Sequence, residues 1–172
     1  MKPLFLILAA VICCSGITLA QHKSEKTDSA PGSASPGDLR VREGLNQLSQ
    51  KFVVDADGDF KIIRDTTGGR TQVAWIISKT NTYGGVEIRE IISPAFKTSG
   101  HLSAELATRL LKENNKYKIG FWRLVGEDAS QAVFYASQIP ATIDAQSLDA
   151  AIKSVTMIAD AMEKEQVGTD DF

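Results

Sequence analysis

Three short apolar runs, joined by turns of only a few residues, constrain the fold of this chain more than any other feature. The runs cover 60–65, 72–79 and 86–92, and a glycine pair lies in each turn between them. Apolar residues alternate along the runs, which is typical of strands. Because turns this short join antiparallel neighbours, the pattern predicts an antiparallel sheet rather than a parallel one.

The side chains of these runs can be assigned to two faces of the sheet. The second run carries apolar residues on both faces, so we expect it to be a central strand. In the third run, Glu87 and Arg89 share one face and Glu90 lies on the other, so Glu87 and Glu90 cannot act together as acid and base. We expect this strand to end at Pro94, because proline has no N–H group to donate to a ladder.

The rest of the domain predicts three amphipathic helices and two more strands. These elements are marked by helical or alternating spacing of apolar residues and cover 38–50, 102–114, 117–125, 131–139 and 144–166. The predicted order is α-β-β-β-α-β-β-α, with a short extra strand at 52–55. We therefore predict an α+β fold, in which helices pack on an antiparallel sheet of about five strands. The expected helix N-caps are Asp38, Ser103 and Asp144.

The helix at 102–114 has a leucine stripe and is followed directly by an aromatic strand. We expect this helix to cover the sheet and its stripe to be buried. The stripe consists of Leu106, Leu110 and Leu111. Asn114 is expected to help end the helix, because asparagine tolerates the left-handed conformation. In the strand that follows, Phe121 and Trp122 point to opposite faces, so at most one of them can face the helices.

The first 20 residues have the pattern of a secretory signal peptide. Lys2 precedes an apolar run at 4–14, and small residues end the segment at Ala20. This pattern predicts a periplasmic or secreted protein that is cleaved after Ala20 and has no stable membrane insertion afterwards. The alternatives are an uncleaved membrane anchor, for which the apolar run is short, and lipidation at Cys13 or Cys14.

The composition divides the rest of the chain into three parts. Residues 21–37 are rich in Ser, Pro, Gly and charged residues, which predicts a flexible tether. Residues 38–166 are predicted to form the folded domain, and residues 167–172 are predicted to be a disordered tail. Both cysteines lie in the signal segment, so the domain can have no disulfide, thiolate nucleophile or cysteine-held metal. The formal net charge is −2 and the basic residues are scattered, so nucleic acid is not an expected partner.

Known catalytic and metal-binding patterns do not occur in the domain. Asp55, Asp57 and Asp59 alternate as in a calcium loop, but the glycine and the carboxylate that such a loop needs later are missing, and Asp57-Gly58 predicts a hairpin turn instead. His22 and His101 have no further ligands at metal-binding spacing. We therefore predict no catalytic residue, no cofactor and no metal ion.

Four aromatic residues of the predicted sheet are the candidates for a binding surface. Their simplest role is packing in the core. If one face of the sheet is uncovered, however, aromatic side chains exposed there would mark a partner-binding surface. The candidates are Trp75, Phe121, Trp122 and Tyr135. A rival interpretation is a small envelope enzyme or ligand carrier, whose site would be built from Tyr83, Glu87, Arg89 and Arg123.

Over 38–166 the chain resembles the YbjN-like proteins, which share the type III secretion chaperone-like fold. The resemblance is carried by the order of the elements and by several landmarks. These are VVDADGDFKI after the first helix, the strand pair QVAWIISK and GVEIREIIS, the helix end LLKENN, the strand KIGFWRL and the closing IPATIDAQSLDAAIKSVTMIADAMEKE. Asn114 is similar to the helix stop that is usual in the family.

The resemblance implies a noncatalytic domain whose surface holds extended peptide and which is often a homodimer. Chaperones of this fold act in the cytosol, whereas this chain has the pattern of an export signal, so the resemblance implies a protein-binding module rather than an effector chaperone. The resulting hypothesis is an exported, nonenzymatic module that binds a protein or peptide at a sheet edge or in a helix–sheet groove.

Overall fold

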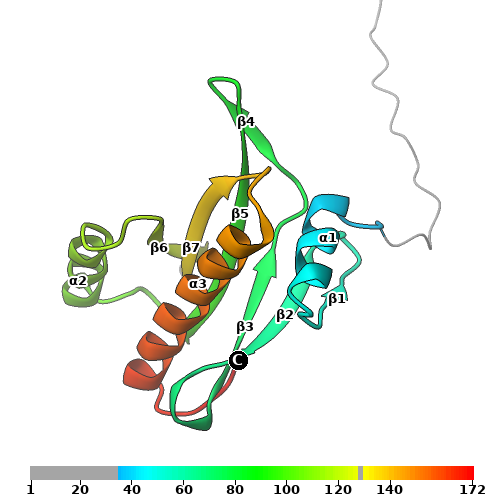
Figure 1. Cartoon of the computed structure of the whole chain (residues 1–172). Coiled ribbons are helices and arrows are strands. Elements are labelled where there is room, and N and C mark those ends of the chain that lie inside the picture. The colour runs from blue at the N-terminus through cyan, green and yellow to red at the C-terminus, as the bar shows by residue number, and fades with distance from the viewer. Residues whose placement is uncertain (1–34, 128–129) are drawn as a thin grey trace, which may run out of the picture. The chain divides into compact units, whose positions relative to one another are not determined.

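The computed structural model describes residues 35–127 and 130–172 (Figure 1). The predicted signal peptide and most of the predicted tether lie outside the described residues. The described residues form a seven-stranded antiparallel sheet and three α-helices, which confirms the predicted α+β class. The helices are α1 (Leu39–Gln47), α2 (Ala104–Asn114) and α3 (Ala145–Gln166). The strands are β1 (Val53–Val54), β2 (Phe60–Asp65), β3 (Thr71–Ile76), β4 (Asn81–Tyr83), β5 (Val86–Thr98), β6 (Gly120–Glu127) and β7 (Ser130–Pro140).

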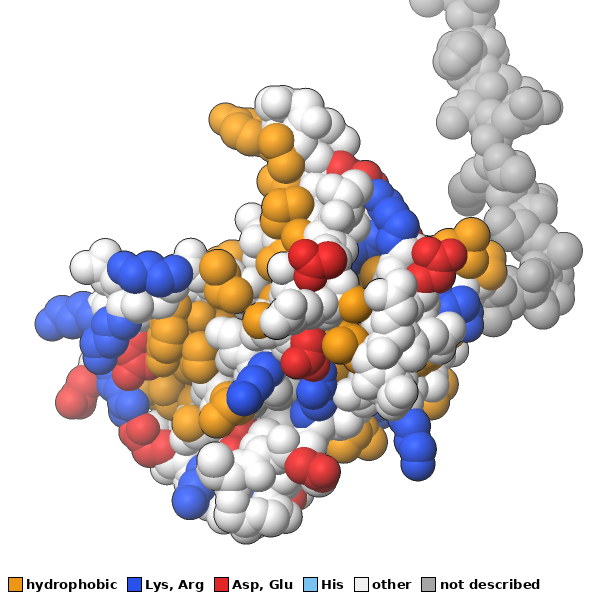
Figure 2. Space-filling model, viewed as in Figure 1, with side chains coloured by type: hydrophobic (Ala, Val, Ile, Leu, Met, Phe, Trp, Pro, Cys, Tyr) orange, Lys and Arg blue, Asp and Glu red, His pale blue; other side chains and the backbone are white. Residues whose placement is uncertain are grey.

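The strands are arranged in the order β1-β2-β3-β5-β7-β6, and β4 pairs with β5 alone. β1 confirms the short extra strand predicted at 52–55, and β4 is the strand that was not predicted, since its residues were assigned to a turn. β4 and the start of β5 form a hairpin that carries Tyr83 and Val86, which are 81% and 51% exposed. Hydrophobic side chains are visible on this hairpin at the top of Figure 2. Gly84 and Gly85 make its turn with φ angles of 57° and 82°, which glycine adopts without strain.

The three predicted N-caps are confirmed. The side chain of Asp38 accepts a hydrogen bond from the backbone N–H of Arg40, at the start of α1. The corresponding residues of α2 and α3, Ser103 and Asp144, accept from backbone N–H groups three residues later. Each cap satisfies one of the N–H groups that have no partner within the first helical turn.

β5 continues through Pro94 to Thr98, so the prediction that Pro94 ends the strand is wrong. The carbonyl of Glu90 accepts from the N–H of Ile77, so the backbone groups of Glu90 and of every second residue after it point toward β3. Pro94 belongs to this set, but the ladder between β3 and β5 has ended before it. The missing N–H group of Pro94 therefore removes no hydrogen bond between strands. The carbonyl of Pro94 accepts a hydrogen bond from the Gln72 side chain at 3.0 Å.

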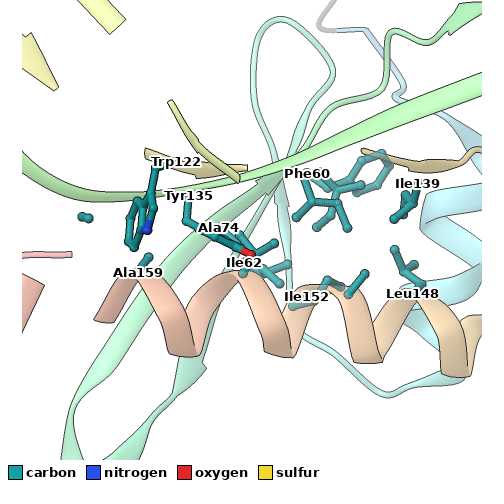
Figure 3. Packing of buried hydrophobic residues seen from close by; sticks show 14 of the residues in the cluster. Phe60, Ile62, Ala74, Trp122, Tyr135, Ile139, Leu148, Ile152 and Ala159 are labelled. Carbon is teal, nitrogen blue, oxygen red and sulfur yellow. The ribbon is translucent and has the colours of Figure 1, made fainter. Parts of the chain in front are cut away.

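α3 lies across the sheet and supplies most of the helical side of the core (Figure 3). Its predicted apolar stripe is buried and includes Leu148, Ile152, Val155 and Ala159. α1 packs on the same side, where a Cβ atom on Gly44 would lie 3.0 Å from the Leu148 side chain. Within 35–127 and 130–172, no helix combines the length and the apolar character needed to cross a membrane.

α2 lies beside the edge strand β6, so the prediction that this helix covers the sheet is wrong. Of its leucine stripe, only Leu110 is fully buried, while Leu106 is half-buried and Leu111 is 71% exposed. Asn114 ends the helix as predicted, but without a left-handed conformation. Its side-chain amide accepts from the N–H of Trp122 at 2.6 Å and donates to the carbonyl of Trp122 at 3.4 Å. The amide thereby occupies backbone groups at the open edge of β6.

The segment 167–172, predicted to be disordered, instead contacts α3 and the turn between β2 and β3. Arg70 donates to the carbonyl of Thr169 at 2.8 Å. The backbone N–H of Asp171 donates to the buried carboxylate of Glu163 at 2.7 Å. A polar terminal segment becomes ordered when the domain offers it such partners, and those partners come from distant parts of the sequence.

Replacing Gly120 by alanine is expected to lower the free energy of unfolding by about 1–3 kcal/mol. A Cβ atom there would lie 2.5 Å from the ring of Tyr135, which is fully buried and contacts Trp122 edge to face. Urea denaturation followed by circular dichroism measures the change. Gly44→Ala is the matched control, because its methyl group would meet only the flexible end of Leu148. Equal losses in the two variants would contradict the tight packing at Gly120.

Candidate partner-binding surface

The register of the strands divides their side chains between two faces of the sheet. One face packs against α1 and α3 and carries Phe60, Ile62, Ala74, Ile76 and Ile91. No helix of the part of the chain that the structure describes packs on the opposite face, which we call the uncovered face. Its large hydrophobic side chains include Ile63, Trp75, Ile92, Phe121 and Phe134.

Two of the predicted aromatic residues lie in one cross-strand row on the uncovered face. Trp75 on β3 pairs with Ile92 on β5. Ile92 pairs with Ala136 on β7, which pairs in turn with Phe121 on β6. Neighbouring strands are about 4.8 Å apart, so Trp75 and Phe121 lie about 14 Å from each other along the row. With the neighbouring Phe134, the half-buried side chains of this row form what we call the apolar band: Trp75, Ile92, Phe121 and Phe134.

Charged side chains border the apolar band. Arg123 donates to Glu90 at 2.7 Å, and both residues lie on the uncovered face. The ammonium group of Lys61 lies 5.5 Å from the centroid of the Trp75 ring. Aromatic residues and arginine are enriched at surfaces that bind other proteins, so this composition fits a binding surface better than an ordinary solvated one.

The other two predicted aromatic residues, Trp122 and Tyr135, belong to the core (Figure 3). They are 7% and 0% exposed and lie on the helix-covered face, with their ring centroids 5.0 Å apart in an edge-to-face contact. Burial raises the pKa of the Tyr135 hydroxyl. The indole N–H of Trp122 donates to Glu113 of α2 at 3.1 Å. Trp122 thereby joins β6 to α2, and neither side chain forms part of the surface.

The structure therefore separates the four aromatic candidates into two pairs. Trp75 and Phe121 share the uncovered face, and Ile92 and Phe134 join them although the sequence did not mark these as site residues. Alternation along β5 does place Ile92 on the same face as Glu90. That signal identifies neighbours on a face, but it does not show which face lacks helices.

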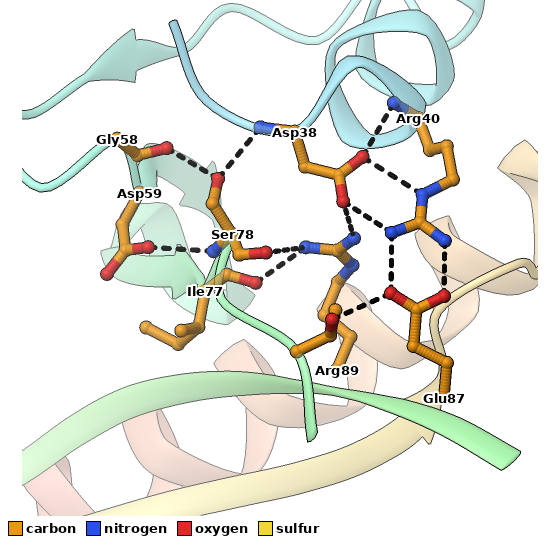
Figure 4. Close-up of polar contacts among 9 residues, drawn as sticks. Asp38, Arg40, Gly58, Asp59, Ile77, Ser78, Glu87 and Arg89 are labelled. Carbon is orange, nitrogen blue, oxygen red and sulfur yellow. Dashed lines mark hydrogen bonds and ion pairs between the residues drawn. The ribbon is translucent and has the colours of Figure 1, made fainter. Parts of the chain in front are cut away.

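The four residues of the rival enzyme or carrier site do not converge. Glu87 and Arg89 lie together on the helix-covered face, as their shared strand face predicts. Tyr83 lies at the tip of the β4–β5 hairpin, and Arg123 lies on the uncovered face. Glu87 and Arg89 instead meet the start of α1 at Asp38, in a group of ion pairs shown in Figure 4.

We call Asp38, Arg40, Glu87 and Arg89 the helix-start network. Arg89, whose side chain is 2% exposed, donates to Asp38 and to the carbonyl of Ile77 at 2.6 Å. Arg40 bridges Asp38 and Glu87, with 2.7 Å between its guanidinium and Glu87. Hydrogen bonds from Arg40 hold the pKa of Asp38 well below its usual range, and hydrogen bonds from Arg40 and Thr80 lower the pKa of Glu87 to about 2. Both carboxylates are therefore ionised and paired at neutral pH, and the network fastens α1 to the sheet.

The aspartates between β1 and β2 form a turn and not a calcium loop. One carboxylate oxygen of Asp55 accepts from the backbone N–H groups of Asp57 and Asp59, at 3.1 and 2.9 Å. The carboxylate of Asp59 accepts from the N–H of Ser78 at 2.7 Å. Asp55 therefore stabilises the turn that Asp57-Gly58 predicts, and Asp59 joins this turn to the backbone after β3.

One acidic cluster was not predicted from the sequence. Oxygen atoms of Asp160, Glu163 and Asp170 lie within 4.8 Å of one another. The guanidinium of Arg70 lies 2.6 Å from Asp160 and 2.9 Å from Glu163, so it supplies the positive charge that the cluster requires. Burial raises the pKa of Glu163, which is fully buried. A signal was present, because Asp160 and Glu163 lie three residues apart on the buried side of α3, where an acidic residue needs a partner.

No protein-family model, curated protein or solved structure matches this chain. The resemblance to the YbjN-like proteins therefore stays a prediction from the sequence.

Proposed function

We propose that this protein is an exported, nonenzymatic module that binds another protein or a peptide through the uncovered face. The apolar band is the observation that carries this proposal. Its half-buried side chains keep apolar area in contact with water, and a partner that covers them removes that area from water. Aromatic side chains such as Trp75 and Phe121 are common anchors at interfaces of this kind.

The polar groups of the domain support a binding role more than a catalytic one. In the helix-start network and around Arg70, charged side chains face partners of opposite charge. A general acid or base works best with a pKa near the working pH. The pKa values of Asp38 and Glu87 are instead moved away from neutrality by their arginine partners. Asp38 and Glu87 therefore stabilise the fold and are poorly suited to proton transfer.

Two features of the sequence support the other parts of the proposal. The signal-peptide pattern at 1–20 supports export to the periplasm or beyond. The resemblance to the YbjN-like proteins supports a noncatalytic protein-binding domain on a secretion-chaperone-like fold. The same resemblance supports a homodimer.

A Trp75→Ala/Phe121→Ala double variant is expected to bind the partner at least about 100-fold more weakly, because each aromatic anchor contributes about 1.4 kcal/mol or more. A photo-crosslinking residue in place of Phe134, on the same face, would capture the partner in cell-envelope extracts for identification by mass spectrometry. Titration of the purified partner against the wild type and the double variant then measures the loss of affinity.

The chain offers matched controls for both steps. Tyr83→Ala removes an aromatic side chain that is 81% exposed on the β4–β5 hairpin, and it should leave the affinity unchanged. The same crosslinker at Met157, which is 39% exposed on α3, should not capture the partner. Undiminished affinity in a double variant that unfolds like the wild type would exclude the apolar band as the binding surface.

A further inference from the structure

A groove lies at the β1–β2 margin of the uncovered face and has a volume of about 470 Å³. Its apolar lining consists of Phe52, Val53 and Ile63, and its other two lining residues are Lys51 and Lys61. Val53 and Ile63 are 66% and 60% exposed, so both leave branched aliphatic surface open to water. Grooves of this size and apolar character are typical of sites for small molecules.

The two lysines of the groove have no carboxylate partner within 35–127 and 130–172. Among the described residues, neither Lys51 nor Lys61 forms an ion pair with a carboxylate. The ammonium group of Lys61 instead lies 5.5 Å from the centroid of the Trp75 ring. An apolar floor bordered by two lysine residues is complementary to a ligand with one apolar chain and one anionic end.

The edge of the sheet at this groove is poorly suited to a peptide strand. The N–H of Asp55 donates to the carbonyl of Asp59, so the backbone groups of Asp59, Lys61 and Ile63 point outward from β2. Lys61 already pairs with β1, and the carbonyl of Ile63 accepts from the Gln50 side chain at 3.4 Å. The lining also contains no side-chain amide or hydroxyl that could bind a peptide backbone.

We propose that this groove binds a free fatty acid of medium or long chain. The hydrocarbon chain lies on Val53 and Ile63, where it removes exposed aliphatic surface from water. The carboxylate lies at Lys51 and Lys61, which provide charge-assisted hydrogen bonds. This site does not depend on the proposed function, because it would exist with or without a protein partner on the apolar band.

Isothermal titration calorimetry with laurate, below the concentration at which it forms micelles, tests the proposal on the exported form of the protein. We expect saturable binding that weakens at least about tenfold in a Lys51→Gln/Lys61→Gln variant, because two charged donors are lost. Added salt should also weaken binding to the wild type, because both lysines are solvent-exposed. Laurate should change the fluorescence of Trp75, whose ring contacts Lys61.

Two controls separate this site from unspecific association. Lys97→Gln makes the same substitution at an exposed lysine on the same face but outside the groove, so it should leave laurate affinity unchanged. Dodecyltrimethylammonium has a chain of the same length with a positive charge, and it should not bind.

Three outcomes would overturn the proposal. The first is a laurate affinity in the double lysine variant that stays within about twofold of the wild type, since the loss of charged donors should cost more than that. The second is equally strong binding of dodecyltrimethylammonium. The third is binding to phosphatidylglycerol vesicles without binding to free laurate, which would make the groove a membrane-contact surface instead.

Discussion

Replacing Trp122 by alanine is expected to lower the free energy of unfolding by about 3–5 kcal/mol. Trp122 is 7% exposed, its ring contacts Tyr135 edge to face, and its indole N–H donates to Glu113 at 3.1 Å. Truncation leaves a cavity that the close-packed neighbours can fill only in part, and it leaves the Glu113 carboxylate without this donor. Urea denaturation followed by circular dichroism measures the loss.

The adjacent Phe121 is the matched control for Trp122. It lies on the uncovered face and is only half-buried, so Phe121→Ala should cost about 1 kcal/mol of unfolding free energy. For partner binding the order should be the opposite: Phe121→Ala removes a side chain of the proposed binding surface and should weaken binding directly, whereas Trp122→Ala should not. If Phe121→Ala unfolded the protein as readily as Trp122→Ala does, the assignment of the uncovered face would be wrong, and the proposed binding surface with it.

An Arg89→Met variant should also lose about 3–5 kcal/mol of unfolding free energy. The Arg89 side chain is 2% exposed and donates to Asp38 and to the carbonyl of Ile77. Methionine has a similar length but no donor, so the carbonyl and the carboxylate lose a partner in a site that water reaches poorly. Because Asp38 is also the N-cap of α1, amide hydrogen exchange in α1 should become faster.

Arg123→Met is the matched control, because it makes the same substitution at another strand arginine that forms an ion pair. The side chains of Arg123 and Glu90 are 34% and 24% exposed, so breaking their ion pair should cost about 1 kcal/mol or less. A stable Arg89→Met protein would contradict the structural role of the helix-start network. It would also restore Glu87 and Arg89 as candidates for the site of a small enzyme or ligand carrier.

The parts of the fold that depend on neighbouring residues could be predicted from the sequence. Asp38, Ser103 and Asp144 cap helices because a short polar side chain reaches N–H groups two or three residues later. The turn at Asp57-Gly58 and the apolar stripe of α3 have the same local origin. Hairpin connections then made an antiparallel sheet the expected arrangement.

The wrong predictions concern residues whose partners are distant in the sequence. Pro94 remains within β5 because β3 has already diverged from the strand there. Leu111 is exposed because α2 lies beside β6, where the Asn114 side chain bonds to the backbone of Trp122. The segment 167–172 is ordered through Arg70, which lies about a hundred residues before it. None of these contacts has a signature within a short window of sequence.

The candidate surface shows where the information in the sequence ends. Alternation along the strands is enough to place Phe121 and Trp122 on opposite faces and to place Glu87 beside Arg89. It cannot decide which face the helices cover. Both faces of the central strands are apolar, and the alternation of side chains along a strand does not depend on which face the helices pack against. The packing of α3 decides that question, by burying Trp122 and leaving Trp75 and Phe121 facing water. The sequence by itself thus determined most of the elements, the helix N-caps and which side chains of a strand share a face. Only the tertiary structure decided which aromatic residues are core and which are available to a partner.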